Sequence, residues 1–294
     1  MSDVLAAPAI QARAVSPTAL LLQRLVRRKL VLLSMLVLLV MVFCAVTAPW
    51  IAPYPPQRMD VAHRLAPPSA LHWFGSDDFG RDVLTRCMYG ARLSLTCGFL
   101  VVLVSLTCGT TLGVISGYVR RLDGLLMRVT DALMAFPDIL LAIALMAALG
   151  ASLSDVVIAL GTVYTPRVAR VARGGVLVLR ELQFVEAAEA LGASDRRVML
   201  QHLLPNLISP LLVQGTFIFA FAILTEAALS FLGAGVPPTN PTWGNMIASA
   251  QQYMEQAQWL ILAPGICIAL TVLSLQMVGD GLRDALDPRL RRLT

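Results

Sequence analysis

The sequence predicts an all-α, polytopic integral membrane protein with six transmembrane helices and both termini in the cytoplasm. Composition is the first observation: 57% of the 294 residues are hydrophobic and 14% are charged, and the mean hydropathy is +0.74. Soluble domains contain roughly 45–50% apolar residues, so this chain has too few charges to cover a surface that faces water. The second observation is a series of six apolar segments, several of which reach the ~20 residues that cross ~30 Å of hydrocarbon.

The third observation is the position of the basic residues, which sets the predicted orientation. Cytoplasmic loops of membrane proteins are enriched in Lys and Arg. With a cytoplasmic N-terminus, 18 of the 23 lysines and arginines fall on the cytoplasmic side. The two later extracytoplasmic loops, near Ala151 and over residues 233–258, then contain none.

These patterns divide the chain into five parts. They are a cytoplasmic N-terminal tail (1–29), a first transmembrane helix (30–51), an extracytoplasmic loop with an amphipathic helix (52–92), a core of helices two to six (93–281) and a cytoplasmic C-terminal tail (282–294). The loop begins with an extended, proline-rich stretch. Its amphipathic helix is predicted to be capped by Ser76 or Asp77. The apolar stripe within residues 79–91 suits the membrane surface or a neighbouring helix.

Within the core, the fourth apolar segment is the shortest. Residues 153–165 number 13, or ~20 Å of helix, which is too short for the full hydrocarbon layer. Arg167, Arg170 and Arg173 follow at every third position. Such arginines either extend toward the lipid headgroups or face a watery protein interior. We expect a helix that begins in the membrane and continues into the cytosol.

Two acidic residues and two prolines interrupt the predicted spans. Asp131 lies in the third span and Glu226 in the fifth. Because a charge at membrane depth is costly, each either lines a transport pathway or bonds a neighbouring helix. Pro137 and Pro264 remove backbone hydrogen bonds and are expected to kink the third and sixth spans, for gating or for packing.

A polar segment, residues 184–206, lies between the fourth and fifth spans. Its sequence Glu-Ala-Ala-Glu-Ala-Leu consists of strong helix formers, and Gly192 is predicted to close that helix in the left-handed conformation. Ser194 or Asp195 then caps a second short helix, which Pro205 stops. On these features alone, the segment is either a solvated cytoplasmic loop or a docking surface for another protein.

The same segment resembles the EAA signature of importer permeases in the ATP-binding-cassette (ABC) superfamily. That signature is EAA, three residues, Gly, nine residues, then Ile-x-Leu-Pro, and His202 takes the isoleucine position here. In that family the segment forms a coupling helix that docks in a cleft on the ATPase subunit. The residues that match at the family's spacing are Glu186, Ala187, Ala188, Gly192, Leu204 and Pro205. The resemblance also places Ala193, Ser194, Arg196 and Arg197 in the coupling segment.

Two further stretches narrow the resemblance to one branch of the superfamily. Residues 73–95, WFGSDDFGRDVLTRCMYGARLSL, and residues 226–246, EAALSFLGAGVPPTNPTWGNM, are similar to the C-type permease of the dipeptide/oligopeptide/nickel family. The resemblance implies a type I ABC importer permease fold in the bacterial cytoplasmic (inner) membrane. It also implies a heterodimer with a homologous B-type permease, two ABC ATPase subunits and an extracytoplasmic solute-binding protein.

No catalytic residues and no metal ligands are predicted. Lys29 is the only lysine, which excludes a Walker A GxxxxGK[ST] loop; the resemblance implies that partner ATPase subunits bind ATP and Mg²⁺ and that this chain carries no cofactor. The three histidines are scattered and match no metal-binding motif. The net charge of +5 comes from residues at membrane borders rather than from a basic patch for nucleic acid. The four tryptophans are expected in an aromatic belt at the outer interface.

The sequence thus predicts a transport subunit rather than an enzyme. It would move dipeptides, oligopeptides or a related small solute by alternating access, with energy transmitted through the coupling segment. The alternative is an ion-coupled secondary transporter or channel that uses Asp131 or Glu226, and a membrane hydrolase is a third class. Dipeptides, oligopeptides, glutathione, opines and nickel chelates all remain possible solutes on the resemblance.

Overall fold

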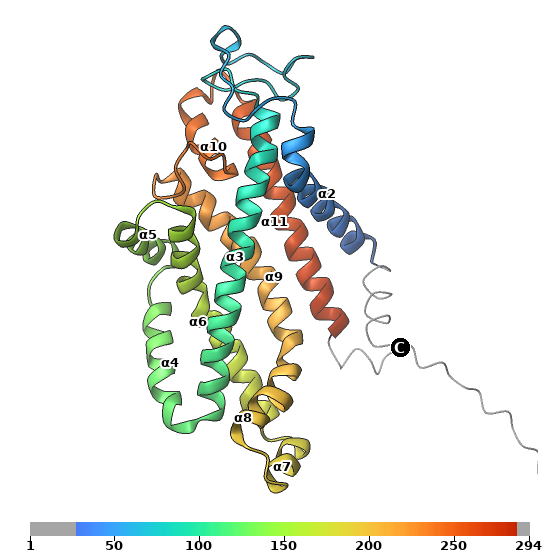
Figure 1. Cartoon of the computed structure of the whole chain (residues 1–294), viewed down its shortest axis with the longest axis vertical. Coiled ribbons are helices and arrows are strands. Elements are labelled where there is room, and N and C mark those ends of the chain that lie inside the picture. The colour runs from blue at the N-terminus through green and yellow to red at the C-terminus, as the bar shows by residue number, and fades with distance from the viewer. Residues whose placement is uncertain (1–27, 287–294) are drawn as a thin grey trace, which may run out of the picture.

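The computed structural model describes residues 28–286, and within this range the regular elements are helices, with a single isolated β-bridge between Ser76 and Asp82. The long helices form an elongated bundle, shown in Figure 1. Most of the two predicted terminal tails, namely residues 1–27 and 287–294, lies outside the described residues. The all-helical class predicted from composition is confirmed for the described part of the chain.

The helices follow the predicted order. The long ones are α2 (Lys29–Ile51), α3 (Val83–Tyr118), α4 (Arg120–Met134), α5 (Asp138–Leu149), α6 (Leu153–Leu179), α9 (Leu204–Phe231) and α11 (Trp259–Leu286). The short ones are η1 (Val61–His63), α7 (Gln183–Ala190), α8 (Asp195–Arg197), the π-helical η2 (Val198–Leu203), α10 (Trp243–Ala250) and η3 (Gln251–Tyr253).

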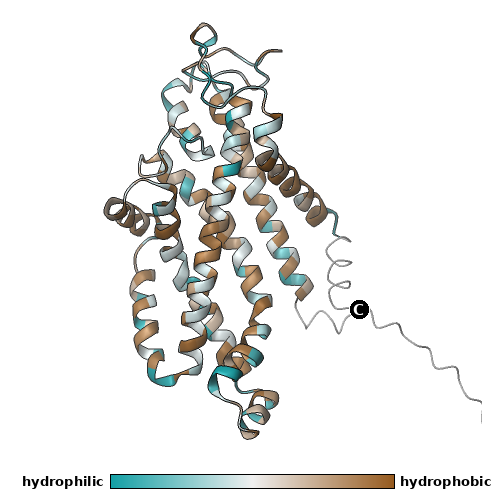
Figure 2. Cartoon of the chain, in the orientation of Figure 1, coloured by the Kyte–Doolittle hydropathy of each residue, from teal (hydrophilic) through white to brown (hydrophobic). Residues whose placement is uncertain are grey.

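Four helical segments of the described chain are long and apolar enough to cross a membrane: α2, α3, α11 and the continuous helix Asp195–Phe231. A fifth results if α4 and α5 together form one span, broken by a bend of 95°. Helix α6, the predicted fourth span, has 27 residues and is ~40 Å long, but its arginines make it too polar to qualify on composition. The apolar character of α2 and α5 is visible in Figure 2.

Glycines on one face of α3 bring α6 into close contact. Gly109, Gly113 and Gly117 recur every fourth residue, and a Cβ atom at Gly113 would lie 2.4 Å from the carbonyl oxygen of Ala169. Small residues at this spacing let two membrane helices approach backbone to backbone. The resulting core includes Val168 and Ala172 of α6. This contact determines which face of α6 is covered and which is left open.

The start of α3 differs from the prediction. Its N-cap is Asp82, whose side chain accepts a hydrogen bond from the Thr85 N–H at 2.8 Å, and not Ser76 or Asp77. The predicted amphipathic helix is therefore the first part of α3, continuous with the second span. Its apolar stripe packs on neighbouring helices, since Val83 and Cys87 are buried against α10 and α11.

The predicted third span is two helices rather than one kinked helix. Helix α4 ends at Met134 and α5 begins at Asp138, with Pro137 at the junction. Proline lacks the N–H that would continue the helix and disfavours the helical conformation of the residue before it. Pro264, in contrast, lies within the uninterrupted helix α11.

Candidate functional site

The polar segment between α6 and α9 forms one end of the molecule, opposite the loop that follows α2 (Figure 1). It contains α7, a tight turn, α8 and η2. Of the residues assigned to coupling, Glu186, Ala187, Gly192, Ser194, Arg196, Arg197 and Pro205 are exposed, whereas Ala188, Ala193 and Leu204 are half-buried.

The turn after α7 has the predicted left-handed glycine. Gly192 has a φ of +82°. Its N–H donates to the carbonyl oxygen of Glu189 at 2.9 Å, and the Ala193 N–H donates to that of Ala188 at 3.0 Å. These two bonds form a Schellman motif, which satisfies carbonyls that the helix end leaves unpaired. The motif fixes the angle between α7 and α8.

The segment is firmly joined to the helical bundle. Val185, Val198 and Leu203 are fully buried in the main hydrophobic core. At the end of α3, the Tyr118 hydroxyl lies 3.1 Å from Glu189 Oε1 and 3.0 Å from Asp195 Oδ1, so that its proton can be donated to either carboxylate. The segment is therefore attached both to the end of α3 and to the core that contains residues of α6 and α9.

The outer side of the segment carries exposed apolar side chains, which we call the tip surface. Leu191 is 89% exposed, the largest value among the exposed large hydrophobic residues of the described chain. Large apolar side chains that gather on an exposed surface mark protein–protein contacts. The tip surface consists of Leu182, Phe184, Leu191 and Leu200. Sequence analysis missed Leu191, although its place directly before the capping glycine removes it from the buried stripe of α7.

The prediction that Pro205 stops the second helix of the segment is wrong. The helix runs without interruption from Asp195 to Phe231, and Pro205 occupies its interior. The Leu204 N–H donates to the carbonyl oxygen of Met199, five residues earlier. This π-helical geometry redirects the backbone bonds just before the proline, whose ring would obstruct an ordinary α-helical turn. Ser194 is the N-cap in position, but its side chain makes no capping bond.

The three arginines of α6 each pair with an aspartate, and we call this set the ion-pair ladder. Asp131, predicted to line a pathway or to bond a neighbouring helix, accepts a hydrogen bond from Arg170 at 2.7 Å. The two other pairs, which sequence analysis missed, join Arg167 to Asp138 at 2.5 Å and Arg173 to Asp123 through two bonds of 2.6 Å. The ladder links α6 to both α4 and α5.

Glu226, the second intramembrane acid, is sealed inside the protein. It is 1% exposed, and the Ser230 hydroxyl donates to its Oε1 at 2.9 Å. Trp243 is also fully buried; its Nε1–H donates to the carbonyl oxygen of Cys87 at 3.0 Å. The prediction that Trp243 belongs to an interfacial belt is therefore wrong, because the chain after α9 folds back and inserts this side chain between helices.

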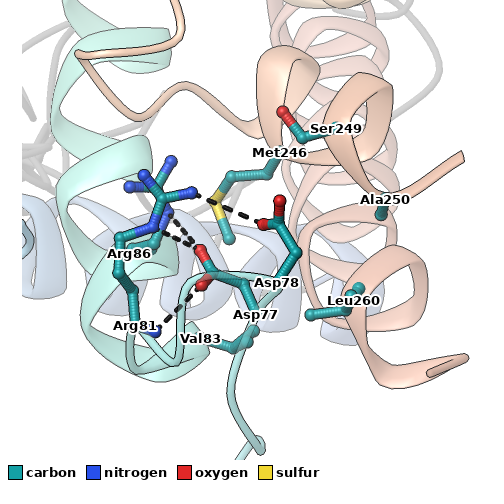
Figure 3. Close-up of a pocket in the computed structure, with 9 residues that line it drawn as sticks. All are labelled: Asp77, Asp78, Arg81, Val83, Arg86, Met246, Ser249, Ala250 and Leu260. Carbon is teal, nitrogen blue, oxygen red and sulfur yellow. Dashed lines mark hydrogen bonds and ion pairs between the residues drawn. The ribbon is translucent and has the colours of Figure 1, made fainter. Parts of the chain in front are cut away.

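At the opposite end from the tip surface, a group of charged side chains lies between the loop after α2 and helices α10 and α11 (Figure 3). Asp77 accepts a hydrogen bond from Arg81 Nε at 2.6 Å, and Arg86 Nε is 3.6 Å from the same carboxylate. Arg86 is 3% exposed and its Nη1 has no hydrogen-bond partner in the described chain. Burial and the charge of Asp77 raise the pKa of Asp78. Two cations and two anions thus neutralise each other beneath the surface.

Two family comparisons match most of the chain. The family described as "Binding-protein-dependent transport system inner membrane component" matches residues 109–292. The family described as "N-terminal TM domain of oligopeptide transport permease C" matches residues 16–68. The first match contains the coupling segment and the ion-pair ladder.

Individual relatives match over nearly their whole length. A Brucella suis protein, provisionally named as a peptide transport system permease, is 50% identical over 94% of this chain and 93% of its own. The dipeptide transport system permease protein DppC of Alkalihalophilus pseudofirmus is 45% identical over 97% of this chain and 94% of its own. The di/tripeptide transport system permease protein DppC of Pseudomonas aeruginosa is 44% identical over 88% of each.

A solved structure has the same fold. It is an inward-facing conformation of the MetNI methionine ABC transporter, with a TM-score of 0.57 and 18% sequence identity over 70% of this chain and 97% of that one. At this identity the match shows the fold alone, and it confirms the expected ABC importer permease architecture. Together with the matched families, it establishes that this chain belongs to the binding-protein-dependent transport system inner membrane components, the permease subunits of ABC importers.

Proposed function

We propose that this chain is the C-type permease subunit of an ATP-driven importer of dipeptides or oligopeptides. The observation that carries the proposal is the tip surface: an EAA-type segment that exposes Leu191 while its base is locked into the bundle. The peptide substrate is supported by the names of the relatives from Alkalihalophilus pseudofirmus and Pseudomonas aeruginosa. The chain acts in transport, and hydrolysis of ATP belongs to its partners.

The proposed topology has six spans with both termini in the cytoplasm, and α6 is the fourth span. The division into residues 1–29, 30–51, 52–92, 93–281 and 282–294 is retained, with the coupling segment at 184–206, except that α3 already begins at Val83, within the part 52–92. This arrangement places the tip surface in the cytoplasm and the charged group around Arg86 outside. The assembly comprises a B-type permease, two ABC ATPases and an extracytoplasmic solute-binding protein. ATP and Mg²⁺ bind to the ATPases, and this chain needs no cofactor.

In the proposed mechanism, the tip surface sits in a cleft of an ATPase subunit. Closure of the two ATPases on ATP moves the coupling segments of the two permeases toward each other. Because α8 is continuous with α9 and Tyr118 joins the segment to α3, these helices move with it as rigid bodies. Such rocking exchanges an inward-open for an outward-open state, a two-state shift that ATP biases.

The ion-coupled alternative gains no support. Asp131 is paired with Arg170, and Glu226 is enclosed and bonded to Ser230. Each acid is thus bonded to a side chain within the protein, as expected of an intramembrane acid with a structural role. Neither acid is unpaired on an open surface.

The proposal is tested by replacing residues 186–192 with a Gly/Ser linker in the assembled importer. We expect peptide uptake to be lost while the B-type permease still copurifies with the variant chain, because the bundle itself is untouched. The control replaces residues 67–71, an exposed stretch of the extracytoplasmic loop, with a linker of the same composition. Normal uptake with the Gly/Ser linker would overturn the coupling role.

A further inference from the structure

The ion-pair ladder follows one face of α6, and it crosses the break between α4 and α5. Arg173 and Arg170 reach Asp123 and Asp131 on α4, whereas Arg167 reaches Asp138 at the start of α5. The opposite face of α6 is packed on the glycines of α3. The six charged side chains of the ladder are between 26% and 58% exposed, so they form an open polar stripe.

The depth of this stripe makes its exposure significant. Arg167 and Arg173 follow the first residue of α6, Leu153, by 14 and 20 positions, which is ~21 and ~30 Å along the helix. With Leu153 at the outer boundary of a ~30 Å hydrocarbon layer, the stripe runs through the inner third of that layer. A charged side chain that faces lipid costs roughly 2.5–3.5 kcal/mol at the centre of the membrane even on the most lenient scale, and less toward the boundary. Something other than lipid tails must cover these groups.

Lipid headgroups at the inner boundary are close only to the cytoplasmic end of the stripe. For the deeper part, two covers are physically possible: water in a passage, or the partner permease. The centres of protein–protein interfaces are depleted in charged residues, and enclosing three ion pairs there would incur their desolvation cost. Water leaves the pairs solvated and imposes no such cost. We propose that the ion-pair ladder lines the water-filled passage and provides a polar track for a zwitterionic solute.

The chemistry of the ladder suits transient binding. Each arginine is neutralised by its own aspartate, so the stripe has no net charge that would trap a solute. A passage must bind its solute well enough to admit it and weakly enough to release it. At the most exposed pair, the carboxylate of a peptide can bind Arg170 while its ammonium group binds Asp131. This solute assignment rests on the proposed function, whereas the exposure of the stripe to water does not.

The two ends of the ladder differ in rigidity. At the cytoplasmic end, Asp123 is held by both Arg173 bonds and by the Ser116 hydroxyl. At the end that lies deeper in the membrane, the Arg167 guanidinium lies over the rings of Tyr164 and Phe221, 5.5 and 5.7 Å from their centroids. Among residues 28–286, no such additional contact supports Arg170 and Asp131 in the middle, which makes them the pair best able to exchange partners. The experiments therefore target this pair.

The first experiment measures access to water and needs no knowledge of the solute. In the assembled complex with Cys108→Ser, Arg170→Cys is treated from the cytoplasmic side with a membrane-impermeant methanethiosulfonate. The control is Leu270→Cys on α11, an apolar position that is 41% exposed in this chain. A thiol in lipid stays protonated and the thiolate is the reactive form, so we expect Arg170→Cys to react at least ~10-fold faster. Equal rates, or reaction only after detergent separates the permeases, would overturn the proposal.

The second experiment tests the track for zwitterions. The neutral pair Asp131→Asn with Arg170→Gln is compared with the swapped pair Asp131→Arg with Arg170→Asp. We expect the neutral pair to raise the KM for a dipeptide about 10-fold, the loss of ~1.4 kcal/mol, with little change for the N-acetylated amide of the same dipeptide. The swapped pair should restore the preference. An equal decline in the uptake of both solutes would reject a role in recognition. Loss of the coupling between ATP hydrolysis and uptake would instead implicate the coupling segment.

Discussion

The two ends of the molecule differ in whether their charged and apolar side chains are buried or exposed. At the end near Arg86, four charged side chains pair with one another and Trp243 is enclosed. At the other end, Leu191 is 89% exposed, and the adjacent acidic and basic side chains of Glu186 and Arg196 face solvent. At the first end, which we call the closed end, the polar and aromatic side chains contact one another. At the second, which we call the open end, apolar and charged side chains face solvent. On the proposed function, the first end contributes to stability and the second binds the ATPase subunit.

The largest expected effect is at the closed end. Trp243→Ala should lower the free energy of unfolding by about 3–5 kcal/mol, because it removes a fully buried aromatic side chain. The purified complex in detergent would show this as a lower thermal midpoint. Trp50→Ala, at a position that is 79% exposed, should change stability by no more than about 0.5 kcal/mol. Similar losses for both variants would contradict the closed character of this end.

The next effect concerns the paired charges of Figure 3. Asp77→Ala leaves the buried Arg86 and the half-buried Arg81 without their shared carboxylate. Breaking a buried ion pair by removing one partner costs about 3 kcal/mol or more, and we expect a loss of this size in denaturant unfolding. Glu255→Ala, which removes an exposed carboxylate between α10 and α11, serves as the control. A loss below that of the control would show that water already solvates the arginines.

At the open end, a substitution should affect binding rather than folding. Leu191→Asp is expected to weaken binding of the ATPase subunit by ~2 kcal/mol or ~30-fold, as for an anchoring residue of an interface. Its unfolding midpoint should remain unchanged. Gln183→Asp adds the same charge to an exposed position of α7 and should retain most of the affinity. If Leu191→Asp instead unfolded the chain, Leu191 would contribute to stability, as the residues of the closed end do.

A smaller effect is expected from a substitution at Gly192, which strains the backbone without disturbing the packing. Gly192 has a φ of +82°, and a Cβ atom there would meet nothing within 4 Å, so Gly192→Ala costs only the backbone strain of ~1–2 kcal/mol. We expect this strain to lower the ratio of peptide imported to ATP hydrolysed. Gly124→Ala is the matched control, because it also meets nothing within 4 Å but lies in helix α4. It should stabilise the chain by up to ~1 kcal/mol.

The smallest effect is a pH dependence at the closed end. The pKa of Asp78 is raised by burial and by the charge of Asp77, so the folded state binds this proton more tightly than the unfolded state. Between the ordinary Asp pKa of ~3.9 and the raised value, this group makes stability fall as the pH rises. Asp78→Asn should flatten that part of the profile and slightly stabilise the chain at pH 7. An unchanged slope would show that Asp78 is solvated.

The sequence anticipated features that depend on neighbouring residues alone. The helical membrane class followed from composition, and the left-handed turn at Gly192 followed from a glycine at the end of a strong helix former. Features that depend on distant residues escaped it. The partners in the ion-pair ladder are separated by 29, 39 and 50 positions, and no local pattern identifies which aspartate meets which arginine.

The sequence by itself therefore determined the class of the protein and the motif at its tip, because transfer into lipid and backbone conformation are properties of short segments. The tertiary structure alone decided that Trp243 is buried, that Pro205 lies inside a continuous helix and that the arginines of α6 are neutralised. Each of these outcomes depends on which helices come together. The close approach of α3 and α6 through Gly113 sets that arrangement, and it becomes apparent only when the helices are packed.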